Sequence, residues 1–305
     1  MNILKSYAAG YKNIYSLKKI ITIIFGITVM LGLAIAFPFY STLSGGFSAR
    51  PVLKLLFTDF NSTVYFDFMN NYGDMVRPFF ALMIWMGIFY FFFTVFFAGG
   101  ILKLLDGSSI KSKAQAFFAG SSKFFFRFLR LGFYILIFQI ITFAVIAVGF
   151  SSILNRSLSN SAEPKLFAII VIWISFHVLA FIFYSLVSDY AKIILVKEDS
   201  KKVLRALWNS FIFSVKRIYL VYTMYLLLLV VPLIIVIAYA ALEINANINS
   251  GLMVAIMFAL QQLFIWARIF CKAWILGSEY DLFANYIAAK NRPLITQEML
   301  LDESL

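Results

Sequence analysis

The chain has 305 residues, of which 63% are hydrophobic and only 13% are charged, and its formal net charge is +12. A soluble domain usually contains about 45–50% apolar and about 25% charged residues, so the composition excludes a water-soluble globular protein and makes the bilayer the solvent for much of the chain. The single cysteine, Cys271, and the single histidine, His177, exclude an internal disulfide and a structural zinc site, which usually takes about four Cys or His ligands.

Apolar segments long enough to cross a membrane follow one another along the chain. A helix needs about 20 apolar residues to cross about 30 Å of hydrocarbon. Six segments qualify, namely residues 20–43, 79–102, 131–153, 166–187 (the helix continuing to 196), 218–242 and 252–276. The first is longer than the apolar core of a signal peptide, about 7–15 residues, and we expect it to be retained. The sequence predicts an all-α, polytopic transmembrane helical bundle.

Two prolines mark special positions in these spans. Arg77-Pro78 precedes the second span, and Pro78 suits a first helical turn. Pro232 lies inside the fifth span and is expected to kink it, because proline removes a backbone donor and clashes with the preceding turn.

The longest connection between spans, residues 44–77, has two parts. Residues 51–57 have the pattern of a short interfacial helix. Residues 59–77 carry Asp59, Asp67 and Asp74, whose oxygens suit Ca²⁺. Because their spacing matches no calcium loop, we favour a solvated loop.

The distribution of Lys and Arg predicts the orientation. Of the 26 basic residues, 5 fall in the connections that face outside if the N-terminus is inside, and the other 21 fall in the inside segments. The positive-inside rule therefore predicts a multi-pass protein of the cell (inner) membrane with both termini in the cytoplasm. The positive charge then needs no nucleic-acid partner, and it favours anionic lipid headgroups.

Three basic, aromatic segments introduce the odd-numbered spans and indicate an internal repeat. They cover residues 4–20, 114–131 and 203–218, and each reads as a short helix, a small-residue break (Gly10, Gly120, Ser210) and a basic helix start. We interpret the chain as three helical hairpins, each preceded by a cytoplasmic interfacial helix. The repeats are residues 1–107, 108–199 and 200–288 of one membrane domain, followed by a polar tail at 289–305.

The cations of the second and third segments are candidate interfacial lipid contacts. Aromatic side chains can enter the acyl boundary while Lys and Arg meet phosphates. The alternative is that these segments only anchor the following spans in the membrane. The candidates are Lys123, Arg127, Arg130, Lys216 and Arg217.

Two stretches resemble a family of bacterial integral membrane proteins. They are Phe96-Phe-Ala-Gly-Gly-Ile-Leu-Lys-Leu-Leu-Asp-Gly107 with residues 117–131, and Ser188-Asp-Tyr-Ala-Lys-Ile-Ile-Leu-Val-Lys-Glu-Asp199. That family is similar to the membrane domain attached to some glycerophosphodiester phosphodiesterases. The soluble catalytic barrel, about 250 residues, has no counterpart here, so the resemblance implies a membrane domain without the enzyme.

Charged side chains at the inner ends of spans four and six form a candidate polar cluster. Asp189 and Lys192 share a helix face, and so do Arg268 and Lys272, which Glu279 follows. Asp189 could pair with Arg268 or Lys272 if the two spans are neighbours. If the cluster has a function, it is a binding site for a lipid phosphate or an anionic substrate, or it is a gate. Snorkelling helix ends with a structural ion pair are the alternative.

Uncharged polar side chains lie deeper in the spans, at His177, Gln139, Gln261 and Gln262. They suit interhelical hydrogen bonds or a polar patch in a cavity, and we expect His177 to bond across helices. Span six, with both Gln261 and Gln262, is expected to face the bundle interior. We expect no catalytic residue, metal or cofactor.

Three functions remain open at this stage. A non-enzymatic scaffold or lipid- or partner-interacting membrane protein is favoured, with membrane lipids, a protein partner or a second copy of the chain as its partners. A transporter or permease for a small or lipidic substrate is the main alternative. A water-accessible cavity that reaches His177 or Gln261 would favour it. An enzyme acting on lipid headgroups through Asp189, Glu279 or His177 is the third.

Overall fold

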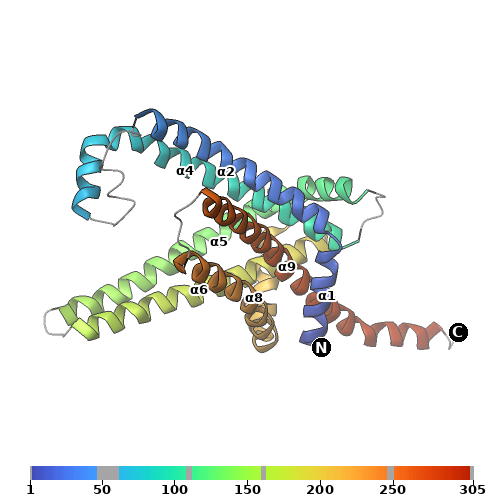
Figure 1. The fold of residues 1–305 in the computed structure, drawn as a ribbon. Helices are drawn as coiled ribbons and strands as arrows, with labels where there is room; N and C mark the ends of the chain where they lie inside the picture. The colour runs from blue at the N-terminus through green and yellow to red at the C-terminus, as the bar shows by residue number, and fades with distance from the viewer. Residues whose placement is uncertain (1, 47–61, 108–111, 159–162, 246–250, 303–305) are drawn as a thin grey trace. The chain divides into compact units, whose positions relative to one another are not determined.

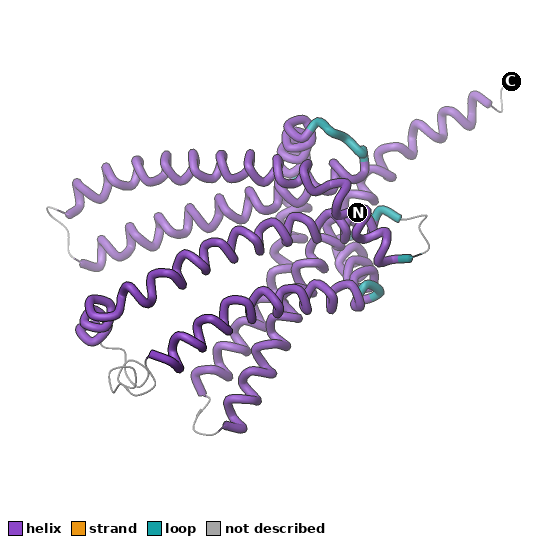
Figure 2. Tube along the Cα trace, turned by 90° about the horizontal axis from the view of Figure 1, so that it is seen from above, coloured by secondary structure: helices purple, strands orange, loops and turns teal. Residues whose placement is uncertain are grey.

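The regular elements of the protein are α-helices throughout the part of the chain that can be described. The computed structural model describes residues 2–46, 62–107, 112–158, 163–245 and 251–302 (Figures 1 and 2). The helices are α1 (Ile3–Tyr15), α2 (Lys18–Gly46), α4 (Ser62–Leu105), α5 (Lys113–Leu158), α6 (Glu163–Lys197), α7 (Val203–Lys216), α8 (Ile218–Asn245) and α9 (Gly251–Asp302).

Six of the described helices are long and apolar enough to cross a membrane, which confirms the predicted class and number of spans. Their apolar stretches are Lys18–Pro38, Arg77–Leu105, Lys113–Ser152, Phe167–Lys197, Ile218–Ile244 and Gly251–Lys290. The protein is a multi-pass integral membrane protein. The predicted tail does not begin a separate element, because α9 continues from its span to Asp302.

The connection before the second span is helical, so the predicted loop at its C-terminal part is wrong. Helix α4 begins at Ser62, and Pro78 lies in its interior rather than in its first turn. The Asn71 side chain donates to the Asp67 carbonyl at 2.9 Å, and Asp74 pairs with Arg77 at 3.2 Å. These contacts between side chains three or four residues apart stabilise the part of α4 that precedes its apolar span. Residues 51–57 and Asp59 lie outside the described residues.

Two compact units divide the chain, one of residues 1–18 with 96–305 and one of residues 19–95. The core of the first unit gathers at the end where the basic segments lie, and Leu131, Tyr190, Leu195 and Leu282 are fully buried there. Farther along the spans the apolar side chains are exposed, as at Phe167 (70%). Lipid can cover such side chains without the cost that water would impose.

Helix α1 lies against α9 through close contact of small residues and aromatic rings. The indole N–H of Trp274 donates to the Tyr7 carbonyl at 3.1 Å, and the Tyr7 and Trp274 rings lie 4.7 Å apart. A Cβ atom added at Gly10 would lie 2.6 Å from the backbone Cα of Ser278, closer than packed atoms approach. Glycine is therefore required where α1 crosses α9.

Equivalent contacts occur at the other two positions where breaks were predicted. A Cβ at Gly120 would lie 2.8 Å from Cγ of Lys103 on α4 and 3.3 Å from the Gly99 carbonyl oxygen. The buried Ser210 hydroxyl on α7 donates to the Val187 carbonyl of α6 at 2.6 Å. In all three places a small side chain lets two helix backbones come close.

The predicted helix breaks at Gly10, Gly120 and Ser210 are therefore wrong. All three residues lie inside helices α1, α5 and α7. The chain instead turns at residues 16–17 and at Arg217, while α5 runs unbroken through its basic segment. Glycine inside a helix costs about 1 kcal/mol relative to alanine, and a close helix contact offsets that cost. The three-hairpin repeat stays a prediction, which these equivalent contacts support.

We predict that Gly10→Ala destabilises the protein by about 1–3 kcal/mol, because the new methyl group overlaps the α9 backbone. Gly149→Ala in α5 is the matched control, since nothing lies within 4 Å of a Cβ there, and alanine favours the helix. Thermal unfolding in detergent followed by tryptophan fluorescence measures both. Equal midpoints for the two variants would show that α1 does not depend on this contact.

Candidate functional site

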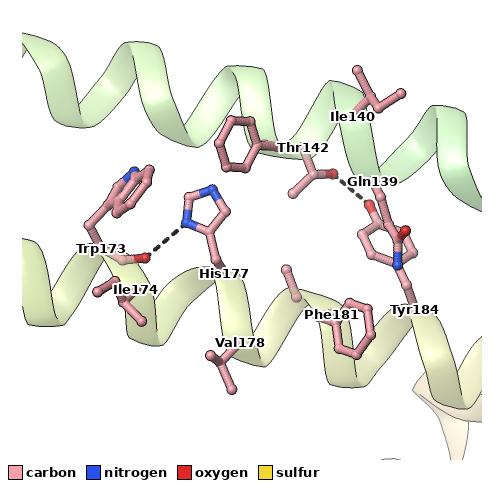
Figure 3. Close-up of a pocket in the computed structure, with 11 residues that line it drawn as sticks. Gln139, Ile140, Thr142, Trp173, Ile174, His177, Val178, Phe181 and Tyr184 are labelled. Carbon is pink, nitrogen blue, oxygen red and sulfur yellow. Dashed lines mark hydrogen bonds between the residues drawn. The ribbon is translucent and has the colours of Figure 1, made fainter. Parts of the chain in front are cut away.

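A pocket lies between α5 and α6, which run side by side within the span region (Figure 3). Its cavity volume is about 550 Å³, within the range of about 300–1,000 Å³ found for ligand pockets. Most of the lining is apolar or aromatic. The lining residues are Gln139, Ile140, Thr142, Phe143, Trp173, Ile174, His177, Val178, Ala180, Phe181 and Tyr184.

His177 is held within its own helix, so the predicted bond to another helix is wrong. Its Nδ1 lies 2.9 Å from the Trp173 carbonyl oxygen one turn earlier (Figure 3). A carbonyl only accepts, so Nδ1 carries the hydrogen and Nε2 of the neutral ring is an acceptor. Nε2 is buried and has no hydrogen-bond partner among the described residues. The Trp173 and Phe143 rings flank the imidazole at 4.6 and 4.7 Å.

Polar groups from both helices meet the same pocket. The hydroxyl groups of Thr142 and Tyr184 share a hydrogen bond of 2.6 Å between α5 and α6 (Figure 3). Gln139 also lines the pocket, and within the described ranges its amide makes no hydrogen bond. Its amide can donate and accept. The sequence analysis missed Thr142 and Tyr184, although they lie three residues from Gln139 and seven from His177, spacings that share a helix face.

The polar residues of span six do not lie as predicted. Gln261, Arg268 and Lys272 are exposed at the surface of the chain, so this part of α9 does not turn all its polar side chains to the bundle interior. Gln262 is half-buried, and its Oε1 is buried without a hydrogen-bond partner in the described part of the chain. Because Gln262 and Gln261 are adjacent, they point to different sides of the helix.

The candidate polar cluster is brought together around Asp189, between the C-terminal part of α6 and the middle of α9. Asp189 pairs with Lys192 on its own helix at 2.6 Å; the described residues give it no ion pair with Arg268 or Lys272, contrary to the predicted alternatives. Lys272 still interacts electrostatically with Lys192, Asp189 and Arg268. Adjacent charges of both signs therefore occupy one region.

Glu279 is the most deeply buried member of this cluster. Its side chain is 1% exposed, and neither carboxyl oxygen has a hydrogen-bond partner among the described residues. Asp189 and Lys192 interact with it electrostatically. A buried carboxyl group without a hydrogen bond is costly, so Glu279 is a candidate functional residue by physical argument.

Two predicted lipid contacts form an internal clamp with a residue that the sequence analysis did not select. Lys123 and Arg127 of α5 contact the Asp199 carboxylate at 2.6 and 2.7 Å, and Arg127 also donates to the Ser200 carbonyl at 3.2 Å. These hydrogen bonds, the Lys123 bond first, lower the pKa of the Asp199 carboxyl below its ordinary value. Asp199 has a left-handed φ of 44°, which aspartate tolerates better than most residues.

The other predicted lipid contacts stay on the surface. Arg130, Lys216 and Arg217 are exposed, and the described residues provide no ion pair for any of them. Arg130 Nε donates to the Phe126 carbonyl at 3.4 Å, and the Arg217 guanidinium lies 5.8 Å from the centre of the Tyr286 ring. These three cations can therefore meet lipid phosphates, whereas Lys123 and Arg127 are engaged by Asp199.

Comparison with known proteins adds no relative, since no family model, no curated protein and no solved structure matches the chain. The resemblance to the membrane domain of glycerophosphodiester phosphodiesterases therefore stays a prediction. The functional assignment depends on the geometry of the chain's own residues.

We predict that Asp199→Asn lowers stability at pH 7 by about 1 kcal/mol, because asparagine keeps the left-handed backbone but removes the charge that holds two cations. Since folding lowers the pKa of Asp199, its stabilisation is present above the unfolded pKa of about 3.9 and is lost as pH falls through the folded value. The gap between the thermal midpoints of wild type and variant should close below about pH 4.

Glu198→Gln is the control for this prediction, because Glu198 is an exposed neighbour of the same charge outside the clamp. Equal losses of thermal midpoint in the two variants at pH 7 would attribute the effect to net charge and reject the clamp.

Proposed function

We propose that the protein is a non-enzymatic integral membrane protein that binds a lipidic molecule in the pocket between α5 and α6. The observation that carries this proposal is a cavity of about 550 Å³ on the membrane-spanning parts of two adjacent helices. The proposed ligand is an apolar chain with one hydroxyl or carbonyl group, because Gln139 offers a free amide within an apolar lining.

The chemistry of the pocket supports binding rather than catalysis. The Thr142 hydroxyl is hydrogen-bonded to Tyr184, and His177 Nδ1 is bonded to the Trp173 carbonyl. A nucleophile needs a base within hydrogen-bond reach. His177 Nε2 is unbonded, but no hydroxyl group of the described residues lies within hydrogen-bond distance of it. The aromatic rings offer large apolar contact to a chain entering from the lipid.

A lipid transporter is the second candidate function. The specific observation in its favour is that the pocket reaches both His177 and Gln139 within the span region. Binding and transport differ in whether the ligand changes leaflet. Movement of a fluorescent pocket ligand between leaflets of reconstituted vesicles would favour transport, and stable retention would favour binding.

The proposed location is the cell (inner) membrane with both termini in the cytoplasm. The support is the excess of Lys and Arg in the segments that include residues 1–19 and 268–292. In this orientation the buried core of the first unit lies toward the cytoplasmic leaflet. Anionic lipids are the proposed partners there, and a protein partner or second copy stays a prediction.

We predict that Ala180→Phe reduces labelling of the pocket by a photoactivatable long-chain alcohol, because the added ring fills the cavity that Ala180 lines. The expected loss is about tenfold, since loss of a buried apolar contact of about 1.5 kcal/mol changes affinity by that factor. Cross-linking in liposomes followed by peptide mass spectrometry measures labelling of α5 and α6.

Ala144→Phe is the matched control, because Ala144 is exposed on α5 and does not line the pocket. Gln139→Leu tests the polar contact: it should remove the preference for the alcohol over its methyl ether while labelling by the ether persists. Labelling that is unchanged by Ala180→Phe would refute the proposed function.

A topology prediction follows from the basic residues. Green fluorescent protein fused to either terminus should fluoresce, and alkaline phosphatase inserted after Asn160 should be active, because residues 154–165 form a predicted outside connection. Reversed reporter activities would reject the proposed orientation and leave the six helices unaffected.

A further inference from the structure

A second pocket lies where α7 meets α8, beside the C-terminal part of the span in α9. It is lined by Arg217, Leu220, Tyr286, Ala289 and Lys290, and its volume is about 470 Å³. The lining combines two cations and a phenol with two apolar side chains, and it includes no carboxylate. Such a pocket favours an anion that also has an apolar part.

Arg217 is placed by a tight change of direction. Helix α7 ends at Lys216 and α8 begins at Ile218, so Arg217 alone joins them. Its N–H donates to the Phe213 carbonyl and its carbonyl accepts from Val221 N–H, each at 3.0 Å. The guanidinium lies 5.8 Å from the Tyr286 ring centre. A cation–π contact at this distance leaves the guanidinium N–H groups free to donate to the two oxygens of a phosphate.

Lys290 brings a second positive charge to the same cavity. It is exposed, and no carboxylate among the described residues pairs with it or with Arg217. The preceding acids of α9 do not line the pocket: Asp281 accepts from the Asn285 amide at 2.9 Å, and Glu279 is buried in the core. Two cations on one pocket repel each other, so an anion between them is attracted by both.

The depth of the pocket along the spans agrees with a lipid source for that anion. Arg217 directly precedes the apolar stretch Ile218–Ile244, and Lys290 lines the same pocket as Arg217. Basic side chains at the ends of spans lie at the level of headgroups. Leu220 and Ala289 provide the apolar surface that a glycerol and the start of an acyl chain would contact.

We propose that Arg217, Tyr286 and Lys290 bind the phosphate group of an anionic lipid headgroup. This inference deepens the proposed function and rests on it in assigning lipid ligands to the chain, but it uses a different pocket. The guanidinium and ammonium groups contact phosphate oxygens, the Tyr286 hydroxyl donates a hydrogen bond, and the acyl chains extend along α8 into the bilayer.

The test is native mass spectrometry of the full chain released from nanodiscs that contain equal amounts of phosphatidylglycerol and phosphatidylcholine. Arg217→Gln/Lys290→Gln should reduce retained phosphatidylglycerol about tenfold, because charge-assisted hydrogen bonds are lost. Lys201→Gln/Arg205→Gln is the matched control: it removes one exposed Lys and one exposed Arg that precede α7 or lie in its first turn but none from the pocket. It should retain phosphatidylglycerol as the wild type does.

Unchanged retention in the pocket variant, or an equal loss in the control variant, would overturn the proposal. A second arm adds inorganic phosphate to lipid-free protein in detergent. If phosphate binding depends on Arg217 and Lys290 but phosphatidylglycerol is not selectively retained, the proposal that the bound phosphate belongs to a lipid is rejected. Ala180→Phe distinguishes failure of one proposal from failure of the other, because Ala180 lines only the pocket between α5 and α6. The variant should retain phosphatidylglycerol as the wild type does, whether or not it reduces labelling between α5 and α6.

Discussion

Close contact between helices at small residues is the constraint on which the first unit of the structure depends. An added methyl group at Gly10 would overlap the Ser278 backbone, and one at Gly120 would overlap the Lys103 side chain and press against the Gly99 carbonyl. The Ser210 hydroxyl forms a third contact by donating to the Val187 carbonyl. Within lipid, helices gain little from hiding apolar side chains from water, so close packing and hydrogen bonds must hold them together. The fully buried residues gather beside these contacts.

The sequence predicted the helical membrane class and the six spans, because an apolar segment of about 20 residues is explained most simply by a helix that crosses the bilayer. It failed at Gly10, Gly120 and Ser210, since a small residue reads equally as a helix break or as a packing contact until its neighbour is known. The helix at residues 62–77 was also missed, because hydrophobic periodicity does not reveal polar helices.

For the candidate sites, single positions were easier to predict than partnerships. His177 and Gln139 were selected as polar residues within spans, and they share a pocket with Thr142 and Tyr184, which were not. Lys123 and Arg127 were assigned to lipid, whereas Asp199 holds both of them. That partner lies 76 and 72 residues away along the chain, and only the fold brings such residues together.

The contact of α1 with α9 also has a consequence for biosynthesis. The Trp274 indole that binds the Tyr7 carbonyl is separated from it by 267 residues. A ribosome adds about 5–20 residues per second and N-terminal parts are made first, so α1 remains without its partner until α9 has been made. The aromatic face of α1 is therefore uncovered while the helices between them are synthesised, and this part of the fold can close only after α9 is present.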